Sequence, residues 1–129
     1  MHIPRAATAV AAVSPRLAVY YDQWHPSSIT KDQTAGITHV ITAFAESKLF
    51  NSDPPQPYQP FVDLPTLRGL FDNGTKVCMA IGGWGDTEGF PVAQKDETSR
   101  KTFAKAVAST VENLGYDCVG TYPALAPPF

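Results

Sequence analysis

A short apolar run that ends in two glycines and a tryptophan limits the folds that this chain can adopt. Residues 77–81 read Val-Cys-Met-Ala-Ile; an Asn73-Gly74 turn signal precedes them and Gly82-Gly83-Trp84 follows. An apolar run of this length between turn signals is typical of a strand buried on both faces. The glycines allow another segment or a ligand to approach the backbone closely. We therefore predict a central strand with an aromatic mouth at its end; the plainer alternative is a turn with Trp84 covering the core.

The rest of the chain alternates between strand-like and helix-like patterns. Further strand-like runs span residues 17–21, 37–45 and 116–120. Helical patterns span a weak segment from Ser27 or Ser28 to Gly36, a second from Asp63 and Pro65 to Asn73-Gly74, and a third from Ser99 to Leu114. The third places Phe103, Val107, Val111 and Leu114 on one apolar face. This alternation predicts an α/β fold with parallel strands and right-handed crossover helices.

The length and composition indicate one globular domain. The chain has 129 residues, of which 43% are hydrophobic and 17% charged, and a net charge of −2. This charge gives no reason to expect nucleic acid or an anionic membrane as a partner, and no apolar run is long enough to span a bilayer. Residues 1–15 form a leader that fits a weak signal or transit peptide, or a disordered extension. The compartment therefore stays open between cytoplasmic and secreted.

The two cysteines, Cys78 and Cys118, each lie inside an apolar strand-like run. We interpret them as buried free thiols that behave as small hydrophobic residues, with a disulfide as the alternative. Neither has a second cysteine or a histidine at metal-ligand spacing, so we predict no metal site and no cofactor. His39, inside the second strand-like run, is interpreted as structural.

Four segments together carry a resemblance to a known family. They are Val19 to Trp24, Ile37 to Ala45, Ala80 to Trp84, and Gly115 to Val119. In this order and at this spacing, the chain resembles the N-terminal part of a family 18 glycoside hydrolase, the chitinase family. The third segment is similar to the family's Ser-x-Gly-Gly motif with its following tryptophan.

The resemblance implies a (β/α)₈ barrel, a fold that typically needs about 250 residues. We therefore expect an incomplete barrel of about four parallel strands with three crossover helices. Residues 16–129 would form the N-terminal portion of the barrel, truncated in the fourth strand.

The resemblance also implies a substrate and the residues that hold it. The implied partner is chitin or an oligomer of N-acetylglucosamine, and no cofactor is implied. Carried over position by position, the substrate-binding residues are Tyr21, Phe44, Gly82, Gly83 and Trp84. Trp24 is a further aromatic side chain that could stack on a sugar ring.

The catalytic residues of the family are not all matched. The family's fourth strand carries Asp-x-x-Asp-x-Asp-x-Glu, in which the Glu protonates the glycosidic oxygen and the neighbouring Asp orients the substrate's N-acetyl group. Asp117 matches only the first Asp, and the next three acidic positions hold Gly120, Tyr122 and Ala124. Ala80 stands where the third-strand motif usually has Ser. We therefore predict that this chain has no catalytic Glu.

Three other carboxylates follow strand ends, namely Asp22, Glu46 and Asp86. We interpret them as solvated loop charges rather than as substitutes for the missing acid.

Three functional hypotheses follow from these residues. The chain is a chitinase-type hydrolase by family that is inactive by itself, or a non-catalytic fragment that binds chitin or chitooligosaccharides. The third hypothesis is a non-functional product that does not fold stably. Because open parallel sheet edges invite pairing, the third hypothesis leaves room for rescue by self-association through those edges.

Overall fold

A computed structural model describes residues 15–25 and 29–122 of the chain. The leader interpreted at residues 1–15 falls almost wholly outside the described residues, as do Ser27, Ser28 and Ala124. The elements are β1 (Ala18–Asp22), β2 (His39–Ala45), the 3₁₀ helix η1 (Ser47–Phe50), α1 (Leu64–Gly69), β3 (Lys76–Gly82), α2 (Gly89–Gln94), α3 (Glu97–Leu114) and β4 (Cys118–Tyr122).

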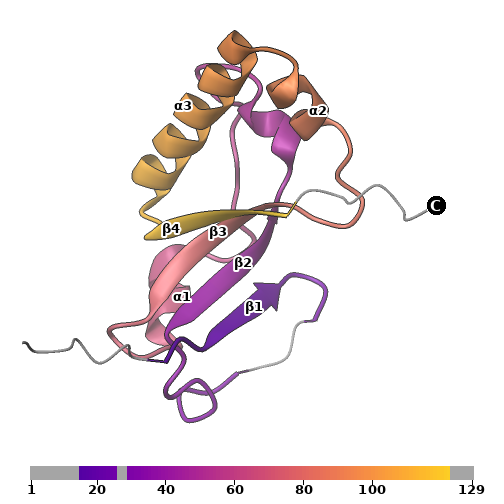
Figure 1. Cartoon of the computed structure of the whole chain (residues 1–129). Coiled ribbons are helices and arrows are strands. Elements are labelled where there is room, and N and C mark those ends of the chain that lie inside the picture. Colours follow the sequence, from indigo (N-terminus) through magenta and orange to yellow (C-terminus); the bar gives the residue numbers. More distant parts are fainter. Residues whose placement is uncertain (1–14, 26–28, 123–129) are drawn as a thin grey trace, which may run out of the picture.

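The four strands form one parallel sheet in the order β1-β2-β3-β4 (Figure 1). Each strand therefore lies beside the strand that follows it in the chain. The predicted α/β class and the parallel arrangement are confirmed. All four strands consequently end at the same edge of the sheet.

The core lies on one face of the sheet, where helices α1 and α3 pack. Strand residues of this face are Val40, Ala45, Val77, Met79 and Ile81, all with no exposed surface. The helices contribute Leu64, Leu67 and Ala106 to the same cluster. Burying each large aliphatic side chain stabilises the fold by about 1.5–3 kcal/mol. The opposite face carries no helix among the described residues, and Tyr20 and Tyr122 are exposed there.

Helix α3 confirms the clearest helical prediction. Its predicted apolar face of Phe103, Val107, Val111 and Leu114 packs against the core. The most deeply buried positions are nevertheless Ala106 and Thr110, whose hydroxyl donates to the Ala106 carbonyl (3.0 Å). Small residues at the centre of the contact let the helix approach the sheet closely.

Helix α1 begins as predicted but ends earlier. Asp63 caps it by accepting a hydrogen bond from the Thr66 N–H (3.1 Å), and Pro65 lies in the first turn. The helix ends at Gly69, before the Asn73-Gly74 turn. Phe71, beyond the helix end, still packs into the core with 2% of its surface exposed.

Two sequence-based predictions about helices are wrong. The weak helix before Gly36 is absent from the described residues 29–36, which form turns; Thr34 there donates its hydroxyl to the carbonyls of Lys31 and Leu70. Conversely, the short helix α2 lies within residues 85–96, where the sequence showed no helical pattern. This helix packs on α3, where Phe90 lies against Phe103, and it also packs on η1. Local propensity could not reveal these contacts.

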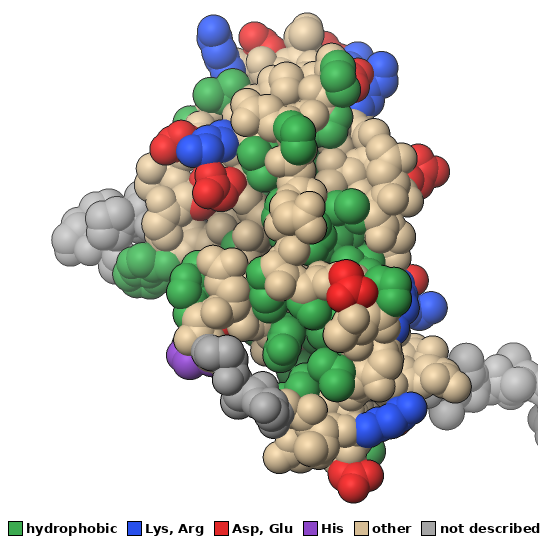
Figure 2. Space-filling view, turned by 180° about the vertical axis from the view of Figure 1, so that it is seen from behind, with side chains coloured by type: hydrophobic (Ala, Val, Ile, Leu, Met, Phe, Trp, Pro, Cys, Tyr) green, Lys and Arg blue, Asp and Glu red, His purple; other side chains and the backbone are tan. Residues whose placement is uncertain are grey.

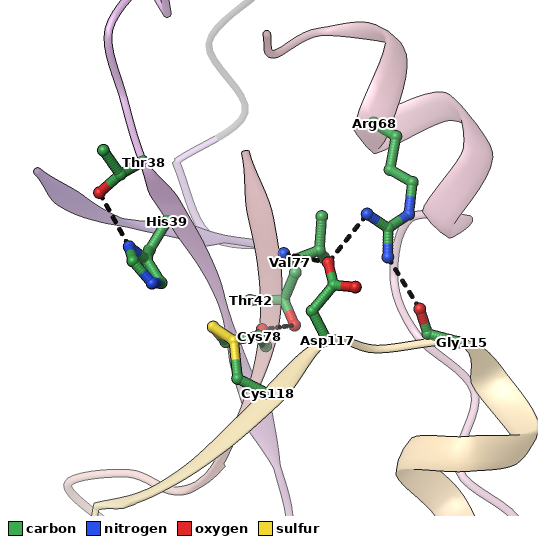
Figure 3. The surroundings of a disulfide bond; sticks show 9 residues. All are labelled: Thr38, His39, Thr42, Arg68, Val77, Cys78, Gly115, Asp117 and Cys118. Atoms are coloured by element: carbon green, nitrogen blue, oxygen red, sulfur yellow. Dashed lines mark hydrogen bonds and ion pairs between the residues drawn. A yellow bond between two sulfur atoms is a disulfide. The ribbon is translucent and has the colours of Figure 1, made fainter. Parts of the chain in front are cut away.

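The interpretation of the cysteines as free thiols is also wrong, because Cys78 and Cys118 form a disulfide. Parallel pairing places the two residues directly opposite one another on β3 and β4, with 4.4 Å between their Cα atoms. The disulfide links the two strands across a sequence separation of 40 residues (Figure 3).

No helix in residues 15–25 and 29–122 is both long enough and apolar enough to cross a membrane.

Candidate functional site

A hollow lies at the carboxyl ends of β1, β2 and β3. It has a volume of about 580 Å³ and is open to solvent. Its lining residues all lie at or just after those strand ends: Gln23, Trp24, Phe44, Glu46, Lys48, Gly82, Gly83, Trp84, Gly85, Asp86, Thr87 and Glu88. In α/β sheets, ligands bind outside the carboxyl ends of the strands. The aromatic mouth predicted after β3 is therefore part of a real concave site.

The two glycines at the end of β3 have a structural reason to be glycines. Gly82 and Gly83 have φ angles of +112° and +116°, a region that side chains strongly disfavour. A Cβ atom on Gly82 would overlap the Tyr122 carbonyl, and one on Gly83 would lie 3.0 Å from the Phe44 ring. The Gly83 N–H donates to that same Tyr122 carbonyl (2.9 Å). The turn therefore brings β3, β4 and Phe44 together at the floor of the hollow.

Three aromatic side chains line the hollow: Trp24, Phe44 and Trp84. Trp84 is 90% exposed and Trp24 is 59% exposed, whereas Phe44 is half-buried at the floor. The peptide bond between Ala43 and Phe44 is cis. The ring of Phe44 lies between those of Tyr20 and Tyr122, with centroid distances of 6.3 and 5.8 Å. Aromatic faces held at the edge of a concave site can pack on the apolar faces of a flat ligand.

The structure places the five residues predicted to bind substrate in two groups. Phe44, Gly82, Gly83 and Trp84 all line the hollow. Tyr21 does not; it lies on the helix-covered side of the sheet, where its ring stacks on Phe61 with a centroid distance of 5.6 Å. Its neighbour Tyr20 faces the open side instead. Strand alternation was the signal that could have separated the two, because successive side chains point to opposite faces.

Asp22 orients the loop that carries Trp24. Its carboxylate accepts hydrogen bonds from the N–H groups of Trp24 (2.8 Å) and His25 (2.9 Å), and the His25 Nδ1 lies 2.9 Å from its Oδ2. The hydrogen bond to the His25 side chain, helped by the two backbone donors, lowers the pKa of Asp22. Asp22 therefore stabilises a local turn through these hydrogen bonds while its carboxylate keeps some contact with solvent.

A small group of charges lies at one side of the hollow. The Lys48 ammonium lies 3.1 Å from a Glu46 oxygen and 3.6 Å from a Glu88 oxygen. The hydrogen bond with Glu46 raises the pKa of Lys48. Glu46 and Glu88 are well exposed, so their carboxylates can accept hydrogen bonds from a ligand's hydroxyl groups.

Asp86 is not a free solvated charge. Its carboxylate accepts hydrogen bonds from the Ser47 backbone N–H (2.6 Å) and from the Ser47 hydroxyl. It thus connects the loop after β3 with helix η1, and it forms part of the wall of the hollow.

Asp117 lies at the other end of the sheet, just before β4 (Figure 3). Its carboxylate accepts from the Val77 N–H and from the Arg68 guanidinium, both at 2.9 Å, and Arg68 also donates to the Gly115 carbonyl (2.8 Å). Burial opposes ionisation, but these hydrogen bonds outweigh it and lower the pKa of Asp117. Asp117 therefore ties α1 to the start of β4, away from the hollow.

Strand β4 follows Asp117, and none of its residues, Cys118–Tyr122, carries a carboxylate. Gly120 pairs with Ala80, and Tyr122 pairs with Gly82 beside Phe44. A shallow hollow of about 140 Å³ covers this part of the open face and includes Tyr20, Ala80, Gly120 and Tyr122 in its lining. No group of three or more histidine, cysteine or acidic side chains is placed to hold a metal ion within the described ranges 15–25 and 29–122.

His39 lies at the start of β2, where its Nδ1 is 2.8 Å from the Thr38 hydroxyl (Figure 3). It does not line either hollow at the strand ends.

Comparison with known proteins identifies the family. The family model of the glycosyl hydrolases family 18 matches residues 16–120. A chitinase-like effector from Moniliophthora roreri is 27% identical over 110 residues, which cover 81% of this chain and 27% of that protein.

Solved structures agree with this match. A family 18 N-acetylglucosaminidase from Paenibacillus barengoltzii superposes with a TM-score of 0.65 at 25% identity, over 82% of this chain and 30% of that one. A mutant family 18 chitinase from Cycas revoluta, solved with (GlcNAc)₄, gives a TM-score of 0.66 at 21% identity, over 88% of this chain and 35% of that one. This chain spans about a third or less of the length of these relatives. It belongs to the glycosyl hydrolases family 18.

Proposed function

We propose that this chain binds oligomers of N-acetylglucosamine in the hollow at the ends of β1, β2 and β3, and that by itself it does not hydrolyse them. The observation that carries the proposal is the placement of Trp24, Phe44 and Trp84 around one open hollow of about 580 Å³. Pyranose rings present flat apolar faces to such aromatic side chains. The carboxylates of Glu46 and Glu88 add acceptors for the sugar hydroxyls at the same rim.

Membership of family 18 supports this class of ligand. The relatives are named as chitinase-like or as acting on N-acetylglucosamine, and the Cycas revoluta protein was solved with (GlcNAc)₄. Chitinase-type hydrolysis of β-1,4-linked N-acetylglucosamine polymers is accordingly the reaction we propose for a polypeptide that combines this chain with the missing acid.

The absence of hydrolysis is proposed from residues within the chain. A glycosidase of this family needs a carboxylic acid to protonate the leaving oxygen and a second carboxylate beside it. Gly120 and Tyr122 occupy two of the corresponding positions on β4, and neither side chain can supply a carboxyl proton. Asp117 matches the first acid of the series, and its carboxylate already accepts hydrogen bonds from the Val77 N–H and the Arg68 guanidinium.

A binding experiment and a turnover experiment test the two halves separately. We expect purified chain to be retained on chitin and to show no release of product from a fluorogenic chitooligosaccharide. The Trp84→Ala variant should bind (GlcNAc)₄ about tenfold more weakly, equivalent to about 1.4 kcal/mol. Val92→Ala is the matched control, because Val92 is exposed but lies outside the hollow.

Equal binding by the Trp84→Ala variant and wild type would overturn the proposed site. Turnover above that of a mock preparation would overturn the proposed lack of activity and leave the binding site intact.

We also propose that a second copy of the chain pairs with the free edge of β4. Within the described residues, β4 pairs only with β3. Val119 and Tyr122 are exposed on it, and an apolar groove of about 340 Å³ runs between β4 and α3. An unpaired strand edge with apolar neighbours is a template for a further strand.

A further inference from the structure

The position of Trp84 is set by its backbone rather than by packing of its ring. The indole is 90% exposed, so few contacts hold the side chain itself. The segment Gly83 to Glu88 carries it along one side of the hollow. At its start, this segment is held by the hydrogen bond from the Gly83 N–H to the Tyr122 carbonyl. A second point of attachment is needed to fix where the indole lies.

Asp86 provides that second attachment. Its carboxylate receives the Ser47 N–H (2.6 Å) and the Ser47 hydroxyl. The Ser47 Oγ in turn accepts from the Gly89 N–H (2.9 Å), and the Asn51 amide donates to the Gly89 carbonyl (3.0 Å). We name these four residues, Ser47, Asn51, Asp86 and Gly89, the clasp.

Within the clasp, Ser47 and Gly89 are buried, whereas Asn51 and Asp86 are half-buried. Ser47 has no exposed surface, and a Cβ atom on Gly89 would overlap the Ser47 backbone. Hydrogen bonds to an ionised carboxylate are stronger than those between neutral groups, and burial reduces competition from water. The contact therefore holds its two segments in one arrangement.

The two segments joined by the clasp form two sides of the same hollow. Glu46 and Lys48 flank Ser47 on the side that follows β2, and Trp84 and Gly85 lie two positions or fewer from Asp86 on the side that follows β3. The Asp86 N–H also closes the turn that contains Trp84 by donating to the Gly83 carbonyl (3.2 Å). Because only Gly85 separates Asp86 from Trp84, we expect a change at Asp86 to alter the backbone that carries the indole.

We propose that Asp86 is a positioning residue, which holds the Trp84 loop against η1 through Ser47 so that the indole is already in place before a sugar binds. The inference rests on the proposed function for its ligand. A group fixed in its binding position loses less conformational freedom on association, and this raises affinity. Releasing the loop should therefore weaken sugar binding and, even without sugar, make the Trp84 indole more mobile.

The test uses the fact that the chain has only two tryptophans. In a Trp24→Phe background, Trp84 is the only tryptophan, so its fluorescence reports the loop alone. Asp86→Asn removes the negative charge and replaces one of the two carboxylate acceptors of the Ser47 donors by an amide N–H₂, which weakens the clasp. Asp32→Asn is the matched control, because Asp32 is an exposed turn residue outside the hollow.

In this background we expect Asp86→Asn to lower the fluorescence anisotropy of Trp84 in the free protein and to weaken (GlcNAc)₄ binding about five- to tenfold. Asp32→Asn should change neither, and Asp86→Glu, which keeps the carboxylate, should recover part of both. An anisotropy in Asp86→Asn equal to that of Asp32→Asn would overturn the proposal.

The readouts separate this inference from the proposed function. If the wild-type chain does not bind (GlcNAc)₄, the proposed ligand is wrong. The anisotropy of Trp84 in the free protein still decides the role of Asp86. If Asp86→Asn lacks a cooperative thermal unfolding transition, Ser47→Ala decides by the same anisotropy measurement. That variant removes the hydroxyl but keeps the backbone donor to Asp86, and unchanged anisotropy in it would overturn the proposal.

Discussion

At the scale of single residues, Tyr20 and Tyr21 show how one position along a strand changes a role. Tyr21 stacks on Phe61 and adds to the core, whereas Tyr20 is 59% exposed on the open face beside Phe44. The two are chemically identical and adjacent. The pleat of the strand alone determines which of them can contact a ligand and which stabilises the fold.

Asp117 carries a prediction about acid stability. Its carboxylate receives the Val77 N–H and the Arg68 guanidinium, and its pKa lies below the ordinary value of 3.8. It therefore stabilises the folded state above that value and loses its contribution as the pH falls through the lowered pKa. Asp117→Asn should reduce the free energy of unfolding at pH 7 by about 1–2 kcal/mol, discounted for partial exposure.

The measurement is urea unfolding from pH 7 down to about pH 2. The difference between wild type and Asp117→Asn should shrink below about pH 4, because both then carry an uncharged group. Asp32→Asn serves as the control for a lost surface carboxylate. A difference that stays constant down to the lowest pH would contradict the assignment.

At the scale of elements, the disulfide joins β4 to the rest of the sheet. Cys78 lies on β3, and Cys118 opens β4, whose far end carries the Tyr122 carbonyl that holds Gly83. A cross-link over a separation of 40 residues restricts the unfolded chain, which corresponds to about 3–4 kcal/mol of stability. Replacing both cysteines by alanine should lower the free energy of unfolding by about that amount.

Thiol counting checks the bond directly. Protein denatured without reductant should show no reactive thiol, and reduced protein should show two, because the chain contains two cysteines. Reduced wild type and the double alanine variant should have similar unfolding midpoints. If two thiols react before reduction, the disulfide is wrong and the cysteines are free, as interpreted from the sequence.

At the scale of the whole molecule, the surface is unevenly apolar. In Figure 2, hydrophobic side chains gather along the middle of the face seen from behind, and charged side chains lie mainly around them. The groove between α3 and β4 is lined almost entirely by apolar groups, including Phe103, Val107 and Val119. Exposed apolar surface next to an open strand edge favours association.

We expect the chain to self-associate in solution, with a mass by light scattering that rises with protein concentration. Val119→Lys should shift the protein towards the monomer, because a lysine on an edge strand opposes pairing. Val92→Lys is the matched control on α2, away from β4. A monomeric mass at all concentrations, or equal effects of the two lysines, would rule out pairing through β4.

Elements with local signals could be predicted from the amino-acid sequence. Each of these signals lies within one short stretch of sequence: the apolar run of β3, the periodicity of α3, and the Asp63 cap with Pro65. Their alternation was enough to predict a parallel sheet, and the Gly82-Gly83-Trp84 corner was enough to predict an aromatic mouth. Local propensity and hydrophobic pattern act over such distances, so these predictions did not depend on the fold.

Contacts between residues far apart in the chain became known from the folded structure. The register of β3 against β4 made Cys78 and Cys118 a disulfide, and contacts with α3 and η1 made a helix of Gly89–Gln94. Asp86, interpreted from the sequence as a solvated loop charge, accepts hydrogen bonds from Ser47, 39 residues away. These outcomes depend on strand register and on packing between segments far apart in the chain, and neither is encoded in any short stretch of residues.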